Sequence, residues 1–149
     1  DDRAIVVEYN PRSSSDIKDI QKDFFEAFAD ALSPYHSSIG HDMSRYQDAL
    51  QLPEDNFVVR LLRLLPSLTA SRGKSAINNA IKDIDRRIYV FVDDFDRLTA
   101  KEILEVLKVI DRNGDFRQTI FITAYDKEYV NNVLANYLHH EKNESYTDK

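Results

Sequence analysis

The sequence contains no cysteine. Disulfide bonds and cysteine-ligated metal sites are therefore excluded, and the composition suits a reducing compartment, which we take to be the cytoplasm. The four histidines are His36, His41, His139 and His140. They have no carboxylate or cysteine partners at metal-ligand spacing, so they do not predict a metal site.

Long hydrophobic runs and an excess of basic residues are missing too. The longest apolar stretches fall far short of the ~20 residues that cross a bilayer, and no signal peptide is visible. The net charge is -6, from 26 acidic and 20 basic residues. Because nucleic-acid binders usually carry basic patches, direct binding of DNA or RNA is not expected.

Glycine is scarce, with three in 149 residues, and the chain opens on Asp1 without an initiator methionine. Both features suggest a piece cut from a larger protein. The length still suffices for one domain with a core, and a hydrophobic content of 42% argues against disorder. We expect residues 1–149 to form a single domain, with a polar and frayed tail over residues 141–149.

Three short apolar runs alternate with amphipathic helical patterns. Their β-branched and aromatic content predicts strands at Ala4–Tyr9, residues 88–92 and Thr119–Thr123. Helical spacing predicts helices over residues 16–32, 43–50, 56–68, 75–85, 99–110 and 126–138. Strands that alternate with helices indicate an α/β fold, a parallel sheet of about three strands flanked by helices.

Two acidic residues, Asp93 and Asp94, directly follow the second predicted strand. They emerge at the carboxyl edge of the sheet, where open α/β sheets bind ligands. Asp93 could hold Mg²⁺ through a water, and Asp94 could orient or deprotonate an attacking water. In the alternative interpretation, both acids are turn residues that cap the next element. The pattern alone leaves both open.

One stretch, SRGKS at residues 71–75, is similar to a phosphate-binding loop. Such a loop needs G-x-x-x-x-G-K-[ST] between a strand and a helix, because backbone amides must wrap the phosphates and glycine tolerates that path. Leu68 stands where the first glycine is required, and a leucine-rich helical pattern precedes it. We therefore predict that Lys74 starts a surface helix and binds no phosphate.

The block VFVDDFDRL, followed by a helix and then by a strand that runs into TAYDKEYV, resembles the KAP family of P-loop NTPases. In that family the Walker B strand ends in DD-x-DR, and a later strand ends near A-Y-D. The segment VVEYNP also resembles the family's Asn-Pro-Trp segment, although Arg12 replaces the tryptophan. The matching residues are Asn10, Pro11, Asp93, Asp94, Asp96, Arg97, Ala124, Tyr125 and Asp126.

The resemblance implies that the parent protein binds and hydrolyses ATP with Mg²⁺. Asp93 would be the metal ligand, and Asp94 the catalytic acid that positions water. Arg97 is then either an ion-pair partner of Asp96 or a nucleotide contact from a neighbouring subunit. Asp126 is either the N-cap of the last helix or a sensor of the γ-phosphate.

The family's Walker A loop lies before the strand that matches residues 4–8, which would place it before Asp1. The chain alone is therefore expected to bind no nucleotide and to be inactive. P-loop proteins of this type order their strands 5-1-4-3-2, so the three predicted strands would lie side by side. The last of them, Thr119–Thr123, would be an exposed edge open to homo-oligomerisation or to an added strand.

Many bacterial members of the family carry transmembrane segments, which would fall near residues 67–74, but nothing apolar enough is present there. The parent is expected in the cytoplasm, with the inner face of a membrane as the alternative. Segment 56–68, with Arg60 and Arg63 on one face, is either a core helix or a segment near a membrane or partner surface.

Two other functions stay open. The chain could be a non-catalytic regulatory or protein-interaction module with an α/β fold, in which the acid pair only caps a turn. It could also belong to another nucleotide-switch class with paired acids, such as an AAA-type or signalling ATPase.

Overall fold

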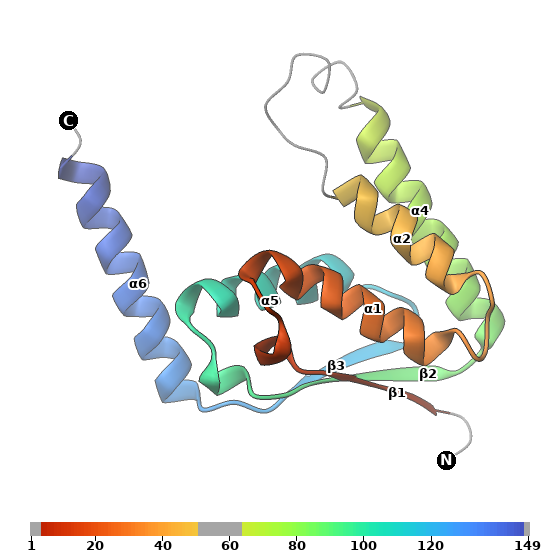
Figure 1. Cartoon of the computed structure of the whole chain (residues 1–149), viewed down its shortest axis with the longest axis horizontal. Helices are drawn as coiled ribbons and strands as arrows, with labels where there is room; N and C mark the ends of the chain where they lie inside the picture. The colour runs from red at the N-terminus through yellow and green to blue at the C-terminus, as the bar shows by residue number, and fades with distance from the viewer. Residues whose placement is uncertain (1–3, 51–63, 148–149) are drawn as a thin grey trace.

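A parallel sheet of three strands organises the molecule in the computed structural model, which describes residues 4–50 and 64–147 (Figure 1). The strands, in spatial order, are β1 (Ala4–Tyr9), β2 (Arg87–Val92) and β3 (Thr119–Thr123). Tyr9 lies opposite Val92, which lies opposite Thr123, so the carboxyl ends of the strands meet at one edge. The predicted α/β class and the three adjacent parallel strands are confirmed.

The two faces of the sheet differ in whether described helices pack on them. Helices α1 (Ile20–Leu32) and α5 (Ala100–Asn113) lie on the same side of the sheet (Figure 1). The strand residues buried on that side are Ile5, Val7, Tyr9, Ile88, Val90 and Val92. No described helix lies on the opposite face (Figure 1). There the exposed fractions are 52% for Val6, 42% for Phe91, 47% for Ile120 and 38% for Ile122.

Aromatic rings join α1 to the sheet. The ring of Phe24 packs 5.5 Å from that of Tyr9 in β1 and 5.8 Å from that of Phe121 in β3. The helix begins at Ile20, later than predicted, because Asp16 caps a short 3-10 turn instead. Its carboxylate accepts the backbone N–H of Lys18 at 3.1 Å.

Helices α2 (Ile39–Leu50) and α4 (Leu64–Ile84) pack side by side and extend away from the sheet (Figure 1). α2 starts earlier than predicted because Ile39 is buried in the core. The predicted break between a helix over residues 56–68 and a second helix over residues 75–85 is wrong, because α4 is continuous from Leu64 to Ile84. Pro66 lies in the first turn of α4, where its missing N–H breaks no helical bond. Most of the predicted helix 56–68 falls outside the described residues.

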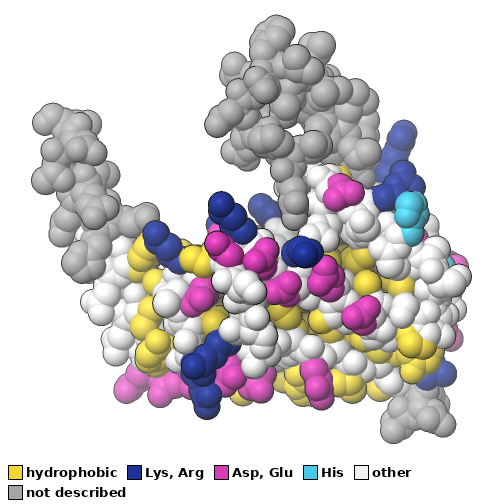
Figure 2. All heavy atoms as spheres, viewed as in Figure 1, with side chains coloured by type: hydrophobic (Ala, Val, Ile, Leu, Met, Phe, Trp, Pro, Cys, Tyr) yellow, Lys and Arg dark blue, Asp and Glu magenta, His cyan; other side chains and the backbone are white. Residues whose placement is uncertain are grey.

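The last helix, α6 (Lys127–Thr147), continues through residues 141–147, where the sequence predicted a frayed end. That stretch contains neither glycine nor proline to stop a helix. Among the described residues, no helix is long and apolar enough to span a membrane. Acidic side chains are spread over the helices and along the lower edge of the face drawn in Figure 2.

Candidate functional site

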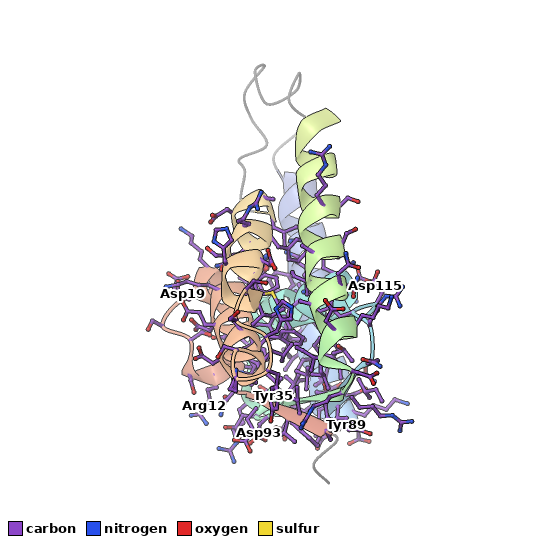
Figure 3. All side chains as sticks on the ribbon, turned by 90° about the vertical axis from the view of Figure 1, so that its right-hand side faces the viewer. Arg12, Asp19, Tyr35, Tyr89, Asp93 and Asp115 are labelled. Carbon is purple, nitrogen blue, oxygen red and sulfur yellow. The ribbon has the colours of Figure 1, made fainter. Side chains whose placement is uncertain are left out.

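The carboxyl ends of β1 and β2 fix the position of Asp93. Its backbone N–H donates to the carbonyl oxygen of Tyr9 at 3.0 Å, so the parallel pairing continues one residue beyond β2. The side chain of Asp93 is exposed. In Figure 3, Asp93 and Tyr89 both lie at the lower side of the view, which is the side of the sheet without a described helix. Asp93 is therefore presented at the carboxyl edge of the sheet, as predicted.

Asp94 lies in a different environment. Its backbone has φ 52° and ψ 26°, the left-handed region that costs most non-glycine residues about 1–2 kcal/mol and that aspartate adopts more readily. One carboxylate oxygen, Oδ2, accepts from Asn10 Nδ2 at 3.1 Å. The other, Oδ1, pairs with Arg97 Nε at 3.1 Å. Both oxygens of Asp94 are thus engaged.

A cavity of about 820 Å³ opens at this edge of the sheet. Its lining consists of Glu8, Tyr9, Asn10, Phe91, Val92, Asp93, Ile122 and Ala124. Glu8, Phe91 and Ile122 are paired across the three strands and belong to the uncovered face. The cavity therefore joins an apolar sheet surface to the Asp93 carboxylate, while Asp94 is not part of its lining.

The residues of this cavity fit a hydrated Mg²⁺. An exposed carboxylate at the mouth of a cavity can bind the ion directly or through a water, and Mg²⁺ takes its other ligands from waters and phosphate oxygens. In the part of the chain that the structure describes, no group of three or more metal-ligating side chains is assembled. Asp93 would thus hold the ion only together with a phosphate ligand.

Tyr9 forms part of the inner wall of the cavity. Its hydroxyl donates to the carbonyl oxygen of Ile20 at 2.7 Å. Burial raises the pKa of Tyr9, and the nearby negative charge of Asp23 raises it further. Tyr9 therefore stays neutral in the folded protein and acts as a structural contact between β1 and α1.

Arg97 and Asp126 both make local contacts. Arg97 pairs with Asp94, so the predicted pairing with Asp96 is wrong; the turn at Phe95–Arg97 brings Asp94 to Arg97 instead. Asp126 caps α6, because its Oδ1 accepts the backbone N–H groups of Glu128 at 2.8 Å and Tyr129 at 3.0 Å. The N-cap interpretation of Asp126 is confirmed. Its contact with a γ-phosphate stays a prediction.

The SRGKS segment is helical, as part of α4, and does not form a loop. Lys74 lies in the middle of this helix, so the prediction that Lys74 starts a helix is wrong. Gly73 allows α4 to approach α2: a Cβ at this position would lie 3.1 Å from Tyr46 Cβ. Lys74 Nζ forms an ion pair with Asp115 at 2.6 Å and donates to the carbonyl oxygen of Arg112 at 2.8 Å. The glycine and the lysine thus serve helix packing.

Asn10 is the site residue whose role sequence reasoning missed. Its Oδ1 accepts the backbone N–H of Arg12 at 3.0 Å, while its Nδ2 donates to Asp94. The signal was present, because a polar residue directly after β1 must reach the same sheet edge as the residues after β2. The strand order implied by the family resemblance makes the ends of β1 and β2 neighbours, but it does not show which side chains bond there.

A parallel α/β sheet with acids at the end of its middle strand, beside a cavity, is consistent with the class of P-loop-type nucleotide-binding domains. The model of the KAP family P-loop domain matches residues 1–149, the whole chain, and the protein belongs to this family. Neither the curated proteins nor the solved structures contain a match to this chain.

Proposed function

We propose that this chain is the Walker B and sensor part of an ATPase, in which ATP hydrolysis drives a conformational change in an assembly. The observation that carries the proposal is the exposed Asp93 carboxylate in a cavity at the carboxyl edge of a parallel sheet. Ligands of open α/β sheets bind at this edge. Membership of the KAP family P-loop domain supports a nucleotide as that ligand.

Each site residue has a proposed role. Mg²⁺, when bound, would neutralise negative charge on the phosphate oxygens. Asp93 would hold the ion, and Asp94 would orient the attacking water. Asp126 would contact the γ-phosphate while still capping α6, and Arg97 would contact nucleotide held by a neighbouring subunit.

The phosphate-binding loop is proposed to come from outside residues 1–149. The glycine-rich motif is missing from the sequence, and its nearest lookalike is helical. Among the described residues, β3 pairs with β2 alone, and the sheet face beside Asp93 is uncovered. A strand, a loop and a helix added there would complete the nucleotide site and cover the second face, as parallel sheets require.

A second candidate function is a non-catalytic interaction module. It is favoured by the structural contacts that the acids already make. Asp94 binds Asn10 after β1 and Arg97 of its own turn, and Asp126 caps α6. In that case the acids stabilise the sheet edge and no ATP is bound.

Calorimetric titration with Mg-ATP tests the proposed nucleotide site. The full-length protein is expected to bind Mg-ATP, and Asp93→Asn to weaken the Mg²⁺-dependent binding about 10- to 100-fold, the scale seen when an indirect metal contact is lost. Residues 1–149 alone are expected to show no tight binding. Asp83→Asn is the matched control, since Asp83 is an exposed carboxylate of α4 that does not line the cavity.

Two results would overturn the proposal. Tight binding of Mg-ATP by residues 1–149 alone would place a phosphate site inside this chain. Binding by Asp93→Asn that cannot be distinguished from that of the parent protein would reject Asp93 as the metal ligand.

A further inference from the structure

The carboxylate of Asp94 does not line the cavity in which it is proposed to orient a water. Asp93 and Asn10 line the cavity, and Asp94 does not. The side chain of Asp94 is 24% exposed, and its two oxygens are taken by Asn10 Nδ2 and Arg97 Nε, each at 3.1 Å. An acid in this state cannot orient a water in the cavity.

The amide of Asn10 has only one orientation that satisfies both of its neighbours. Its Oδ1 faces a donor, the backbone N–H of Arg12, and its Nδ2 faces an acceptor, the Asp94 carboxylate. The reverse orientation would set oxygen against carboxylate and amide hydrogens against the N–H. The contact with Asp94 is therefore a directed hydrogen bond to a charged acceptor, the stronger class of such bonds.

Asn10 takes part in the contact with Asp94 and also lines the cavity. It follows β1, and Asp94 belongs to the turn after β2, so the hydrogen bond spans two strand ends that are 84 positions apart in sequence. The same side chain lines the cavity beside Asp93. A ligand in the cavity can therefore compete with Asp94 for the Asn10 amide.

We propose that Asn10 is a positioning residue which, together with Arg97, keeps the Asp94 carboxylate off the cavity until a ligand with phosphate oxygens takes the Asn10 amide. The effect of this contact on catalysis rests on the proposed ATPase function, whereas the contact between Asn10 and Asp94 does not depend on it. Filling the cavity would free one oxygen of Asp94. Arg97, which is 61% exposed, is the weaker of the two holders because solvent screens its ion pair.

The contact is tested on residues 1–149 without nucleotide. Three-bond NMR couplings to Asp94 Cγ report its χ1 rotamer. We expect one rotamer in the parent chain and averaging in Asn10→Ala. Arg97→Ala, a surface substitution that leaves the core intact, should also produce averaging of the Asp94 χ1 rotamer. Asn79→Ala, which removes an exposed amide from α4, is the control. A single unchanged rotamer in both Asn10→Ala and Arg97→Ala would overturn the proposal.

Kinetics of the full-length protein test the consequence. Releasing Asp94 in Asn10→Ala should raise kcat for ATP hydrolysis about 10- to 100-fold, the factor that corresponds to loss of one hydrogen bond to a charged acceptor in the resting state. KM should change less than kcat, and adding Asp94→Asn should cancel the gain. A fall in kcat in Asn10→Ala would show that Asn10 holds Asp94 in its working position, which contradicts the proposal. If Asp94→Asn alone keeps full turnover, the proposed role of Asp94 fails, and the NMR result still decides the contact.

Discussion

At the residue scale, Asp93 and Asp94 are neighbours in sequence with different surroundings. Asp93 is exposed and lines the cavity, whereas both oxygens of Asp94 are bound by Asn10 and Arg97. The sequence predicts that acids after a buried strand reach the sheet edge, and the structure places Asp93 there. It could not predict the partner of Asp94, because the strand order places Asn10 and Asp94 at one edge without showing which side chains bond there.

Tyr9 makes the stability of the fold depend on pH. Burial raises its pKa in the folded chain above the ordinary value of 10.0, and burial likewise raises the pKa of Tyr46. A group whose folded pKa is raised contributes full stability below the unfolded pKa and loses it as pH rises toward the folded pKa. Stability should therefore fall as pH rises above ~10, because the unfolded chain loses these protons while the folded chain keeps them.

Denaturant unfolding of Tyr9→Phe between neutral pH and pH ~11 checks this dependence. At neutral pH the variant should lose about 1 kcal/mol, because the carbonyl of Ile20 loses its donor. Above pH ~10 its stability should fall less steeply than that of the parent chain, with Tyr46 keeping part of the slope. Equal slopes in the two proteins would reject Tyr9 as a source of the dependence.

At the element scale, short strands were easier to predict than helix limits. AIVVEY and TIFIT carry β-branched runs with turn residues beside them, and both strands have the predicted bounds. The local pattern predicts a break between residues 68 and 75, yet α4 continues through it because its inner face packs on α2. Gly73 is a second case in which packing decides: this glycine of an apparent phosphate motif is required by the contact between α4 and α2.

Gly73→Ala should destabilise the chain. A helix gains up to about 1 kcal/mol from this exchange, but the new Cβ would meet the backbone and Cβ of Tyr46 and push α2 and α4 apart, which typically costs about 1–3 kcal/mol. We expect a net loss of about 1 kcal/mol by denaturant unfolding. Gly40→Ala is the matched control, because its Cβ meets nothing within 4 Å, and it should be neutral or stabilising. Equal effects of the two variants would contradict the packing role of Gly73.

The outer edge of β3 predicts self-association of residues 1–149. In the described residues β3 has one strand partner, and Ile120 on it is 47% exposed. Unpaired apolar edges recruit other strands, and a lysine there opposes pairing. Light scattering should show dimers or larger species at high concentration, and Ile120→Lys should shift them to monomer. Val6→Lys, on the same face at the opposite edge, should not. A monomeric parent chain at all concentrations would reject this interface.

At the scale of the whole molecule, the sequence predicts the parallel sheet, the order of its strands and the position of the acid pair. The parallel sheet and the position of the acid pair follow from local strand patterns, whereas the strand order is what the resemblance to the KAP family implies. The pairing of α2 with α4, the length of α6 and the contacts of Asp94 depend on packing between distant segments, and no local pattern encodes them.

ATP turnover by the full-length protein with Asp94→Asn tests the central claim most directly. The variant keeps the size of the side chain and removes its charge and basicity. We predict that hydrolysis falls at least about 100-fold, the lower range for loss of a general base, while ATP binding is retained. Asp83→Asn, at an exposed carboxylate of α4, should hydrolyse ATP like the parent protein. Unchanged turnover in Asp94→Asn would contradict the account and leave the acid pair with a structural role only.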